Sequence, residues 1–139
     1  MPIIRQHRII RDDLRVNRHV LYLFGDNCER KGHGGQAAAM RGEPNAVGVR
    51  TKYGPTMYAG AFFRDSRHEA QCRMIDEDLE RVRGHLFLGG IAVVPADGLG
   101  TGRAQLEQHA PATFAYLELR LAALAEIGFT GGVRITRAF

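Results

Sequence analysis

The sequence has only two cysteines, only two lysines and no apolar run long enough to cross a membrane. Cys28 and Cys72 lack the spacing of metal ligands, which argues against a zinc site. One disulfide between them is an open alternative, but we favour two free thiols in a reducing compartment. The first residues also lack the apolar core of a signal peptide. We therefore expect a soluble, cytoplasmic protein that contacts no membrane.

The length of 139 residues fits one domain, predicted to span residues 1–139, and is enough to bury a core without disulfide or metal staples. No internal repeat, low-complexity segment or linker interrupts the chain. The net charge of +4 comes almost wholly from arginine, because Lys31 and Lys52 are the only lysines. This charge suits an anionic ligand. Nucleic acid is a weaker alternative, because the arginines are scattered and no aromatic platform accompanies them.

Apolar periodicity predicts strands that alternate with helices. The predicted strands are residues 19–24, 46–52, 86–94 and 133–136, and the predicted helices are residues 35–41, 65–84 and 110–127. The expected inner stripes of the two long helices are Cys72, Ile75, Leu79 and Val82, then Phe114, Leu117, Leu121 and Leu124, with Gly128 as the last C-cap. The alternation predicts an α/β fold with a mostly parallel central sheet flanked by helices.

The first chemically unusual loop follows the strand at residues 19–24 and precedes a helix. Its glycines, three of them within residues 32–35, let backbone N–H groups approach a ligand closely. The start of the following helix adds unpaired N–H groups and favours an anion. Asp26 accepts hydrogen bonds only, which suits an amine or a ribose hydroxyl. The alternative is a plain turn in which Asp26 serves the local backbone.

The second unusual loop follows the most apolar segment of the chain. Gly98, Gly100 and Gly102 alternate around Thr101, whose hydroxyl can donate to a phosphate oxygen. Arg103 can add a bidentate phosphate contact. The loop matches neither a Walker motif nor a dinucleotide-binding fingerprint. A glycine-rich connection without a ligand is the alternative interpretation.

Other polar residues predict less. His33 lies within the first loop, where ligand contact and simple exposure are equally consistent with its position. His68, His85 and His109 are interpreted as surface or capping residues. We expect ordinary packing for Tyr53 and Tyr58, although either ring can stack on a base. No nucleophile triad or metal cluster follows from spacing, so we predict no metal and no cofactor.

Three segments carry a resemblance to a known family. Residues 24–27 read Phe-Gly-Asp-Asn, residues 43–52 read Glu-Pro-Asn-Ala-Val-Gly-Val-Arg-Thr-Lys, and residues 97–102 read Asp-Gly-Leu-Gly-Thr-Gly. This pattern resembles an uncharacterised family of small bacterial and phage proteins. From residue 20 to about residue 124 the layout is also similar to macrodomains, especially the branch that removes ADP-ribose from modified proteins. The resemblance implies a macrodomain-like three-layer sandwich.

The resemblance also implies roles for individual residues. Asp26 would hold the adenine amine, Gly34 and Gly35 would face the distal ribose, and the second loop would hold the diphosphate. Lys52 stands where some relatives carry a lysine that attacks the ribose anomeric carbon. The candidate catalytic residues are Lys52, Asp26 and Asp97. The candidate ligand-binding residues are Gly25, Asp26, Asn27, Gly32, His33, Gly34, Gly35, Gln36, Thr51, Gly98, Leu99, Gly100, Thr101, Gly102 and Arg103.

The expected function is binding of ADP-ribose or a related phosphorylated nucleotide, free or on an ADP-ribosylated macromolecule. Hydrolysis of an ADP-ribosyl linkage and sensing without catalysis both stay open. In the closest hydrolases an aspartate follows the second loop, where this chain has Gly102, and the Asn-Ala-Ala-Asn signature of common macrodomains is absent. A nucleoside-monophosphate phosphoribohydrolase is a further alternative, disfavoured because Ala104 stands where that family has a glutamate. The oligomeric state is not predicted.

Overall fold

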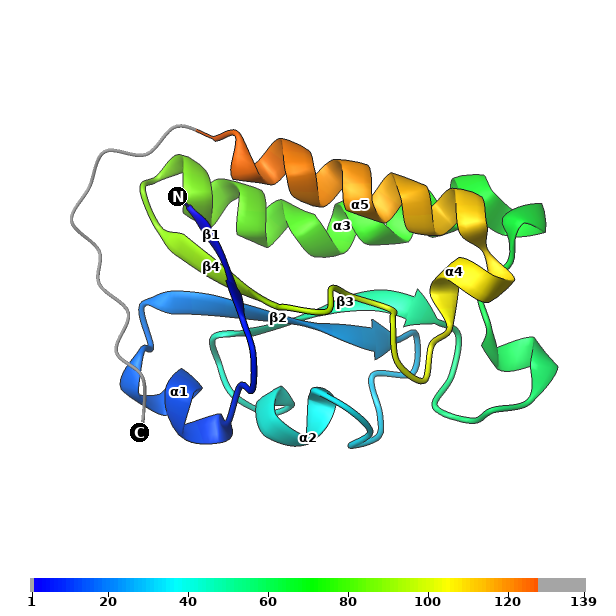
Figure 1. Cartoon of the computed structure of the whole chain (residues 1–139), viewed down its shortest axis with the longest axis horizontal. Helices are drawn as coiled ribbons and strands as arrows, with labels where there is room; N and C mark the ends of the chain where they lie inside the picture. The colour runs from blue at the N-terminus through cyan, green and yellow to red at the C-terminus, as the bar shows by residue number, and fades with distance from the viewer. Residues whose placement is uncertain (1, 128–139) are drawn as a thin grey trace.

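Four parallel strands form the middle layer of the computed structural model, which describes residues 2–127 (Figure 1). The strands are β1 (Ile3–Gln6), β2 (Val20–Asn27), β3 (Ala46–Lys52) and β4 (Ile91–Pro95). Their order across the sheet is β1-β4-β2-β3, so β2 and β4 are central and neighbours. The predicted α/β fold is confirmed, and every strand pair in the described part of the chain is parallel.

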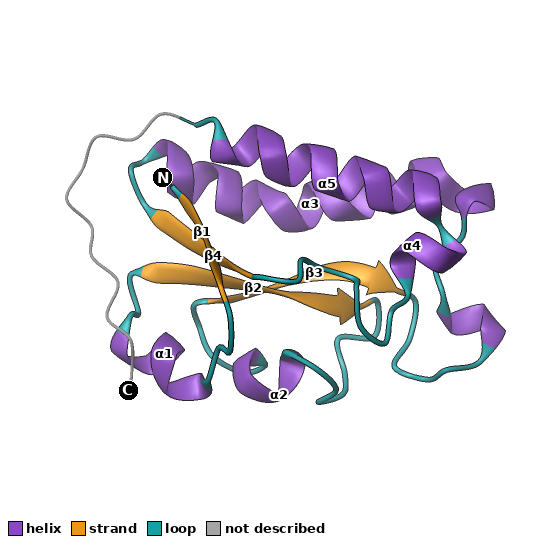
Figure 2. Cartoon of the chain, in the orientation of Figure 1, coloured by secondary structure: helices purple, strands orange, loops and turns teal. Residues whose placement is uncertain are grey.

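Helices cover both faces of this sheet (Figure 2). Two long helices, α3 (His68–Phe87) and α5 (Pro111–Ala125), pack side by side on one face. Two short ones, α1 (Arg11–Val16) and α2 (Ala37–Met40), lie on the other face against β2. Another short helix, α4 (Leu106–His109), precedes α5, and 3-10 turns at Ala59–Ala61 and Asp65–Arg67 precede α3. The result is a three-layer α/β sandwich.

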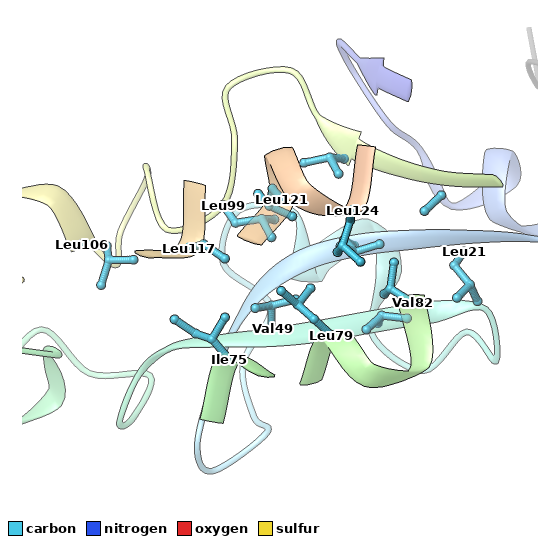
Figure 3. Close-up of a cluster of buried hydrophobic side chains, with 14 of the residues drawn as sticks. Leu21, Val49, Ile75, Leu79, Val82, Leu99, Leu106, Leu117, Leu121 and Leu124 are labelled. Carbon is cyan, nitrogen blue, oxygen red and sulfur yellow. The ribbon is translucent and has the colours of Figure 1, made fainter. Parts of the chain in front are cut away.

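The side chains of β2 explain why this strand lies at the centre. Successive residues of a strand point to opposite faces of the sheet. Leu21 and Leu23 belong to the core cluster beneath α3 and α5, part of which Figure 3 shows. Val20, Tyr22 and Phe24 belong to a second cluster on the face of α1 and α2. A strand covered on both faces reads as a continuous apolar run, as it does here.

The predicted strand at residues 86–94 is wrong in its first half. Helix α3 continues through Gly84, the expected stop, and Leu86 is fully buried on its inner face. The turn that follows contains Gly89 at a φ of 90°, and β4 begins only at Ile91. In a short apolar segment, the buried end of a helix and a buried central strand have the same sequence pattern, because neither is long enough to show its period. The sequence therefore could not show where the helix ended and the strand began.

The inner stripes of the long helices also differ from the prediction at one position each. Gln71 and Thr113 are fully buried, whereas Cys72 and Phe114 are only half-buried. The Gln71 Nε2 donates to the Thr113 Oγ1 at 2.8 Å, which satisfies both polar groups where α3 meets α5. Elements β1, α1 and α4 were not predicted, and Gly128 and the expected strand at residues 133–136 lie outside the described residues.

The strand order places a topological switch point between β2 and β4. From β2 the chain passes through α2, on one face, to β3. From β4 it passes to α4 and α5, and α5 packs on the opposite face. Loops that leave neighbouring strands in opposite directions leave a crevice between them, and ligands of α/β proteins bind in such crevices. The two glycine-rich loops follow these two strands.

Candidate functional site

The carboxyl ends of β2, β3 and β4 border a cleft of about 490 Å³, a size in the range of small-molecule sites. Its walls come from both glycine-rich loops and from the end of β3. The lining residues are Gly25, Asp26, Asn27, Lys31, Gly32, His33, Gly34, Gly35, Gln36, Ala37, Arg41, Thr51, Lys52, Pro55, Pro95, Asp97, Gly98, Gly100, Thr101, Gly102, Arg103 and Ala104.

The first loop is held by its carbonyl oxygens. Arg41, just after α2, donates from Nε to the Gly32 carbonyl at 2.7 Å and from Nη2 to the Lys31 carbonyl at 3.2 Å. The carbonyls of Gly34 and Gly35 accept from the first N–H groups of α2. Within the described chain, the N–H groups of residues 31–36 donate no hydrogen bond. Successive N–H groups left free in this way form a concave anion-binding surface.

The second loop combines a buried anchor with a free backbone. Leu99 is 1% exposed and packs in the core rather than lining the cleft. Gly98 and Gly100 on either side of it have φ values of 90° and 74°, in the left-handed region that glycine tolerates. The N–H groups of Gly100, Thr101 and Gly102 donate no hydrogen bond to residues 2–127. A second set of backbone donors therefore borders the same cleft.

Two close approaches bring the loops together. A Cβ on Gly25 would lie 3.3 Å from the backbone N of Gly100, so the absence of a side chain at residue 25 helps the end of β2 and the second loop to lie close together. A Cβ on Gly34 would lie 3.0 Å from the Cδ of Arg103. The Arg103 side chain thus reaches across to the first loop. The two loops form one site.

An irregularity at the end of β3 directs two consecutive residues to the cleft. Asp26 pairs with Arg50, but Asn27 pairs with Lys52, so Thr51 is the extra residue of a bulge. In a regular strand neighbouring side chains point to opposite faces. Here Thr51 is 1% exposed and Lys52 6% exposed, and both line the cleft. Bulges often re-aim side chains in this way next to functional sites.

Lys52 is a buried cation that contacts neutral groups of the described chain. Its Nζ donates to the Thr56 carbonyl at 2.7 Å and lies 4.9 Å from the centre of the Phe62 ring. No aspartate or glutamate of the described residues forms an ion pair with it. Burial lowers the pKa of Lys52 below its ordinary value, and the charge of Arg103 lowers that pKa further. An anion in the cleft would counteract both effects, because an opposite charge favours the ammonium form.

The Asp26 carboxylate is taken up by two arginines. Its Oδ1 accepts from the Arg41 Nη2 at 2.6 Å, and its Oδ2 accepts from the Arg30 Nη1 at 3.0 Å. The Oδ1 also accepts from the backbone N–H of Asn27 at 2.8 Å. The side chain is 2% exposed. The sequence had suggested that Asp26 binds the ligand or acts in catalysis, whereas in the structure it holds the arginine that fixes the first loop.

Asn27 presents a buried acceptor to the cleft. Its Nδ2 donates to the Lys31 carbonyl at 2.8 Å, and a carbonyl oxygen can only accept, so the orientation of the amide is fixed. The Asn27 Oδ1 is buried and has no donor among residues 2–127. The Gln36 Oε1, also at the cleft, is likewise buried and without a donor in the described chain. Buried acceptors normally have partners, so these atoms are suited to bind a ligand donor.

The rim of the cleft carries polar side chains without partners among the described residues, two of them the cations of Lys31 and Arg103. Lys31, His33 and Arg103 are exposed, and their side chains form no ion pair or hydrogen bond within the described part of the protein. Asp97, exposed at the start of the second loop, also has no such partner among the described residues. Because two arginines neutralise the Asp26 carboxylate, the cleft carries a net positive charge.

The predicted ligand-binding and catalytic residues all line the cleft except Leu99. Arg41 and Pro55 line it too and were not predicted. For Arg41 the signal was indirect: a buried carboxylate such as Asp26 requires a cation, but the sequence does not show which one. The rings of Tyr53 and Tyr58 do not line the cleft.

The remaining candidates have structural partners. His68 is 3.0 Å from the Thr113 Oγ1, His85 is 2.9 Å from the Ile91 carbonyl, and His109 stacks on Phe62 with ring centres 4.1 Å apart. His109 is exposed, as expected of a surface residue, whereas His68 and His85 are half-buried. Cys28 and Cys72 are free thiols, as favoured, and burial raises the pKa of each.

Two kinds of feature are absent from the described residues. Residues 2–127 contain no group of three histidine, cysteine or acidic side chains placed to hold a metal ion. None of the helices within those residues combines the length and apolarity needed to span a membrane.

Comparison with known proteins adds a family but no activity. The family model of a family of unknown function, DUF7831, matches residues 4–120. No curated protein matches the chain, and no solved structure matches it.

Proposed function

Because the chain belongs to the DUF7831 family, whose function is unknown, we propose a function from the cleft itself: it binds ADP-ribose or a related phosphorylated nucleotide. The observation that carries the proposal is the convergence of two glycine-rich loops with free N–H groups on one cationic cleft. Backbone N–H groups of this kind bind phosphate oxygens without sequence-specific side chains. The resemblance of the sequence motifs to macrodomains suggests the same ligand class.

The charges of the cleft favour a ligand with more than one negative charge. Lys52 contributes a buried ammonium group, and Arg103 contributes a guanidinium group that reaches the first loop. A diphosphate fits this arrangement, because one phosphate can contact the first loop while the other contacts the second. We assign the diphosphate to residues 98–103 and the first loop, with Thr51 and Lys52 at the end of β3.

Hydrolysis of an ADP-ribosyl linkage is the second candidate, and one observation favours it. Lys52 is a buried amine with a lowered pKa and no carboxylate partner among the described residues, conditions that activate a lysine. A carboxylate can serve as general base only when no cation holds it. Asp97 meets that requirement, whereas the Asp26 carboxylate is bound by Arg30 and Arg41. In this version of the proposal Lys52 and Asp97 carry the chemistry, and Asp26 positions the loop.

Calorimetric titration with ADP-ribose tests the binding proposal, with AMP and NAD as comparators. The variant to compare is Gly102→Glu, because no atom lies within 4 Å of a Cβ at this position, which spares the fold while adding a negative charge to the cleft. Gly102→Gln has nearly the same size without the charge. Gly84→Glu, at an exposed position on α3 with equal space, is the remote control.

We expect micromolar binding of ADP-ribose that is retained by Gly84→Glu, weakened by Gly102→Gln and abolished by Gly102→Glu. Absence of heat with all three ligands would overturn the proposal. If binding is present, incubation with an ADP-ribosylated protein distinguishes the two candidates. Turnover that is lost in Asp97→Asn while ADP-ribose still binds would assign hydrolysis, and no turnover by the wild type would leave a binding module.

A further inference from the structure

The polar floor of the cleft suggests which part of the ligand is recognised. Asn27 is 7% exposed, ends β2, and has its amide orientation fixed by the bond from Nδ2 to the Lys31 carbonyl. The remaining amide atom, Oδ1, is a buried acceptor with no donor in residues 2–127. Leaving such an atom without a hydrogen bond is unfavourable, because it has lost its contact with water and gained no donor in exchange. A phosphate dianion cannot satisfy it, because a phosphate dianion offers only acceptors.

The lining of the cleft offers little to a nucleobase. Among the described residues that line it there is no phenylalanine, tyrosine or tryptophan, and His33 and Arg103, on which a base can also stack, are exposed at the rim. The carboxylate of Asp26, which suits an exocyclic amine, is bound by Arg30 and Arg41. What the cleft does offer is many donors for phosphate and a buried acceptor in Asn27. A sugar phosphate has the complementary groups.

We propose that the cleft recognises the sugar-phosphate part of its ligand, with the Asn27 Oδ1 accepting a hydrogen bond from a sugar hydroxyl, and does not select the nucleobase. This inference rests on the proposed function, because it concerns the same cleft and requires a phosphorylated ligand. It makes Asn27 the residue that distinguishes a sugar phosphate from a simple phosphate. The base then lies at or beyond the rim and contributes little to affinity.

The test is a titration of the full ¹⁵N-labelled chain, followed by the amide signals of Gly34, Gly35, Gly100 and Gly102. The probes are ethyl phosphate and ribose 5-phosphate, which are both phosphate monoesters but differ in hydroxyl groups. AMP and UMP, which differ only in the base, form the second pair. ADP-ribose is added to establish that the cleft is functional. The variants are Asn27→Ala, which removes the acceptor, and Asn27→Asp, which keeps an acceptor but loses the bond to the Lys31 carbonyl.

We expect the wild type to bind ribose 5-phosphate about five- to tenfold more tightly than ethyl phosphate, the effect of one buried hydrogen bond. Asn27→Ala should lose this preference and Asn27→Asp should regain it. The added charge of Asn27→Asp weakens both probes similarly, so the ratio still reports the hydroxyl. The affinities for AMP and UMP should agree within about twofold.

Three results would overturn the inference while leaving the proposed function intact. These are a wild type without the ribose 5-phosphate preference, an Asn27→Ala variant that keeps the preference, and a difference of more than about tenfold between AMP and UMP. If neither ADP-ribose nor any phosphate probe moves the glycine signals, the proposed function fails and this inference fails with it. If Asn27→Ala loses the native amide spectrum, two other measurements test the inference. These are the ratio of the affinities of Asn27→Asp for ribose 5-phosphate and ethyl phosphate, and the comparison of AMP with UMP in the wild type.

Discussion

The Asp26 carboxylate occupies the space that a Cβ on Gly48 would fill. Gly48 lies on β3 beside β2, and its carbonyl also accepts from the Arg30 Nη1 at 2.8 Å. The absence of a side chain at residue 48 thus allows a buried carboxylate to lie against the backbone of the edge strand. The same carboxylate binds Arg41, which in turn holds the first loop. A glycine outside the cleft therefore helps to set the shape of the cleft.

Gly48→Ala should destabilise the protein by about 1–3 kcal/mol, the usual cost of inserting a methyl group into a filled space. The neighbouring atoms belong to a buried, ion-paired side chain that cannot move away freely. The free energy of unfolding from urea denaturation gives the measurement. Gly60→Ala is the matched control, because Gly60 is exposed with no atom within 4 Å of its Cβ position. Equal stabilities for the two variants would contradict the role assigned to Gly48.

The parts of the fold that the sequence revealed are those in which one local rule decides. β2 is covered on both faces and so reads as an apolar run, whereas the edge strand β1 does not. In β1, Ile4 and Arg5 are exposed and Gln6 is buried, so no apolar pattern marks it. Helix α1 has only six residues, too few to display a period. Strand Ile91–Pro95 was found, but its start was masked by the apolar end of α3.

In the candidate site, too, some features could be predicted from the sequence and others could not. The glycine-rich loops were visible because left-handed backbone at Gly98 and Gly100 demands a particular residue type. The pairing of Asp26 with Arg41 was not, because it depends on how α2 packs beside β2. The bulge that directs Thr51 to the cleft leaves no mark on residue choice at all. A single sequence therefore reveals positions where the backbone conformation requires glycine, but not which distant side chains come into contact.

Arg41→Gln should lower the free energy of unfolding by about 3 kcal/mol, because removing one partner of a buried ion pair leaves the other charge poorly compensated. The Asp26 side chain is 2% exposed and that of Arg41 18% exposed, so solvent screens the pair only weakly. The amides of residues 37–39, which donate to the carbonyls of residues 34–36, should also exchange faster with solvent, since the loop that accepts from them loses its contacts with Arg41.

Arg83→Gln provides the comparison for this variant. Its ion pair with Glu80 lies on the surface, with side chains 54% and 67% exposed, and such pairs contribute little to stability because solvent screens them. An Arg41→Gln variant as stable as Arg83→Gln, with unchanged amide exchange, would show that the first loop does not depend on Arg41.

Glu43→Gln should reduce stability near neutral pH but not in strong acid. Arg11 and Arg18 donate to the Glu43 carboxylate at 2.6 Å and 2.7 Å and lower its pKa to about 2. A carboxylate with a lowered pKa stabilises the fold above its unfolded value of 4.5, and this benefit is lost as the pH falls through about 2. Urea midpoints measured between these limits should therefore converge for the wild type and Glu43→Gln. A constant gap across that range would exclude Glu43 as the source, and Glu80→Gln serves as the exposed control.

Lys52 should titrate below the ordinary pKa of a lysine, and Arg103→Ala should raise its pKa. Burial is the larger cause of the lowered pKa and persists in the variant, whereas the repulsion from Arg103 disappears. Folding then opposes protonation of Lys52, so stability rises as the pH increases from the folded pKa towards the unfolded one. Affinity for a phosphorylated ligand changes in the opposite direction, because the cleft loses a positive charge over the same range.

Competitive acetylation followed by peptide mass spectrometry measures this titration directly. The chain has only two lysines. The acetylation of exposed Lys31 therefore serves as the internal reference against which the acetylation of Lys52 is compared in the same sample. The midpoint of the Lys52 curve, rather than its rate, is compared, since burial slows the reaction at every pH. ADP-ribose should raise that midpoint in the wild type, because an anion favours the charged ammonium group. Lys52→Arg should retain binding at alkaline pH, where the wild type loses it. An affinity that falls equally in both would place the titrating group elsewhere in the cleft.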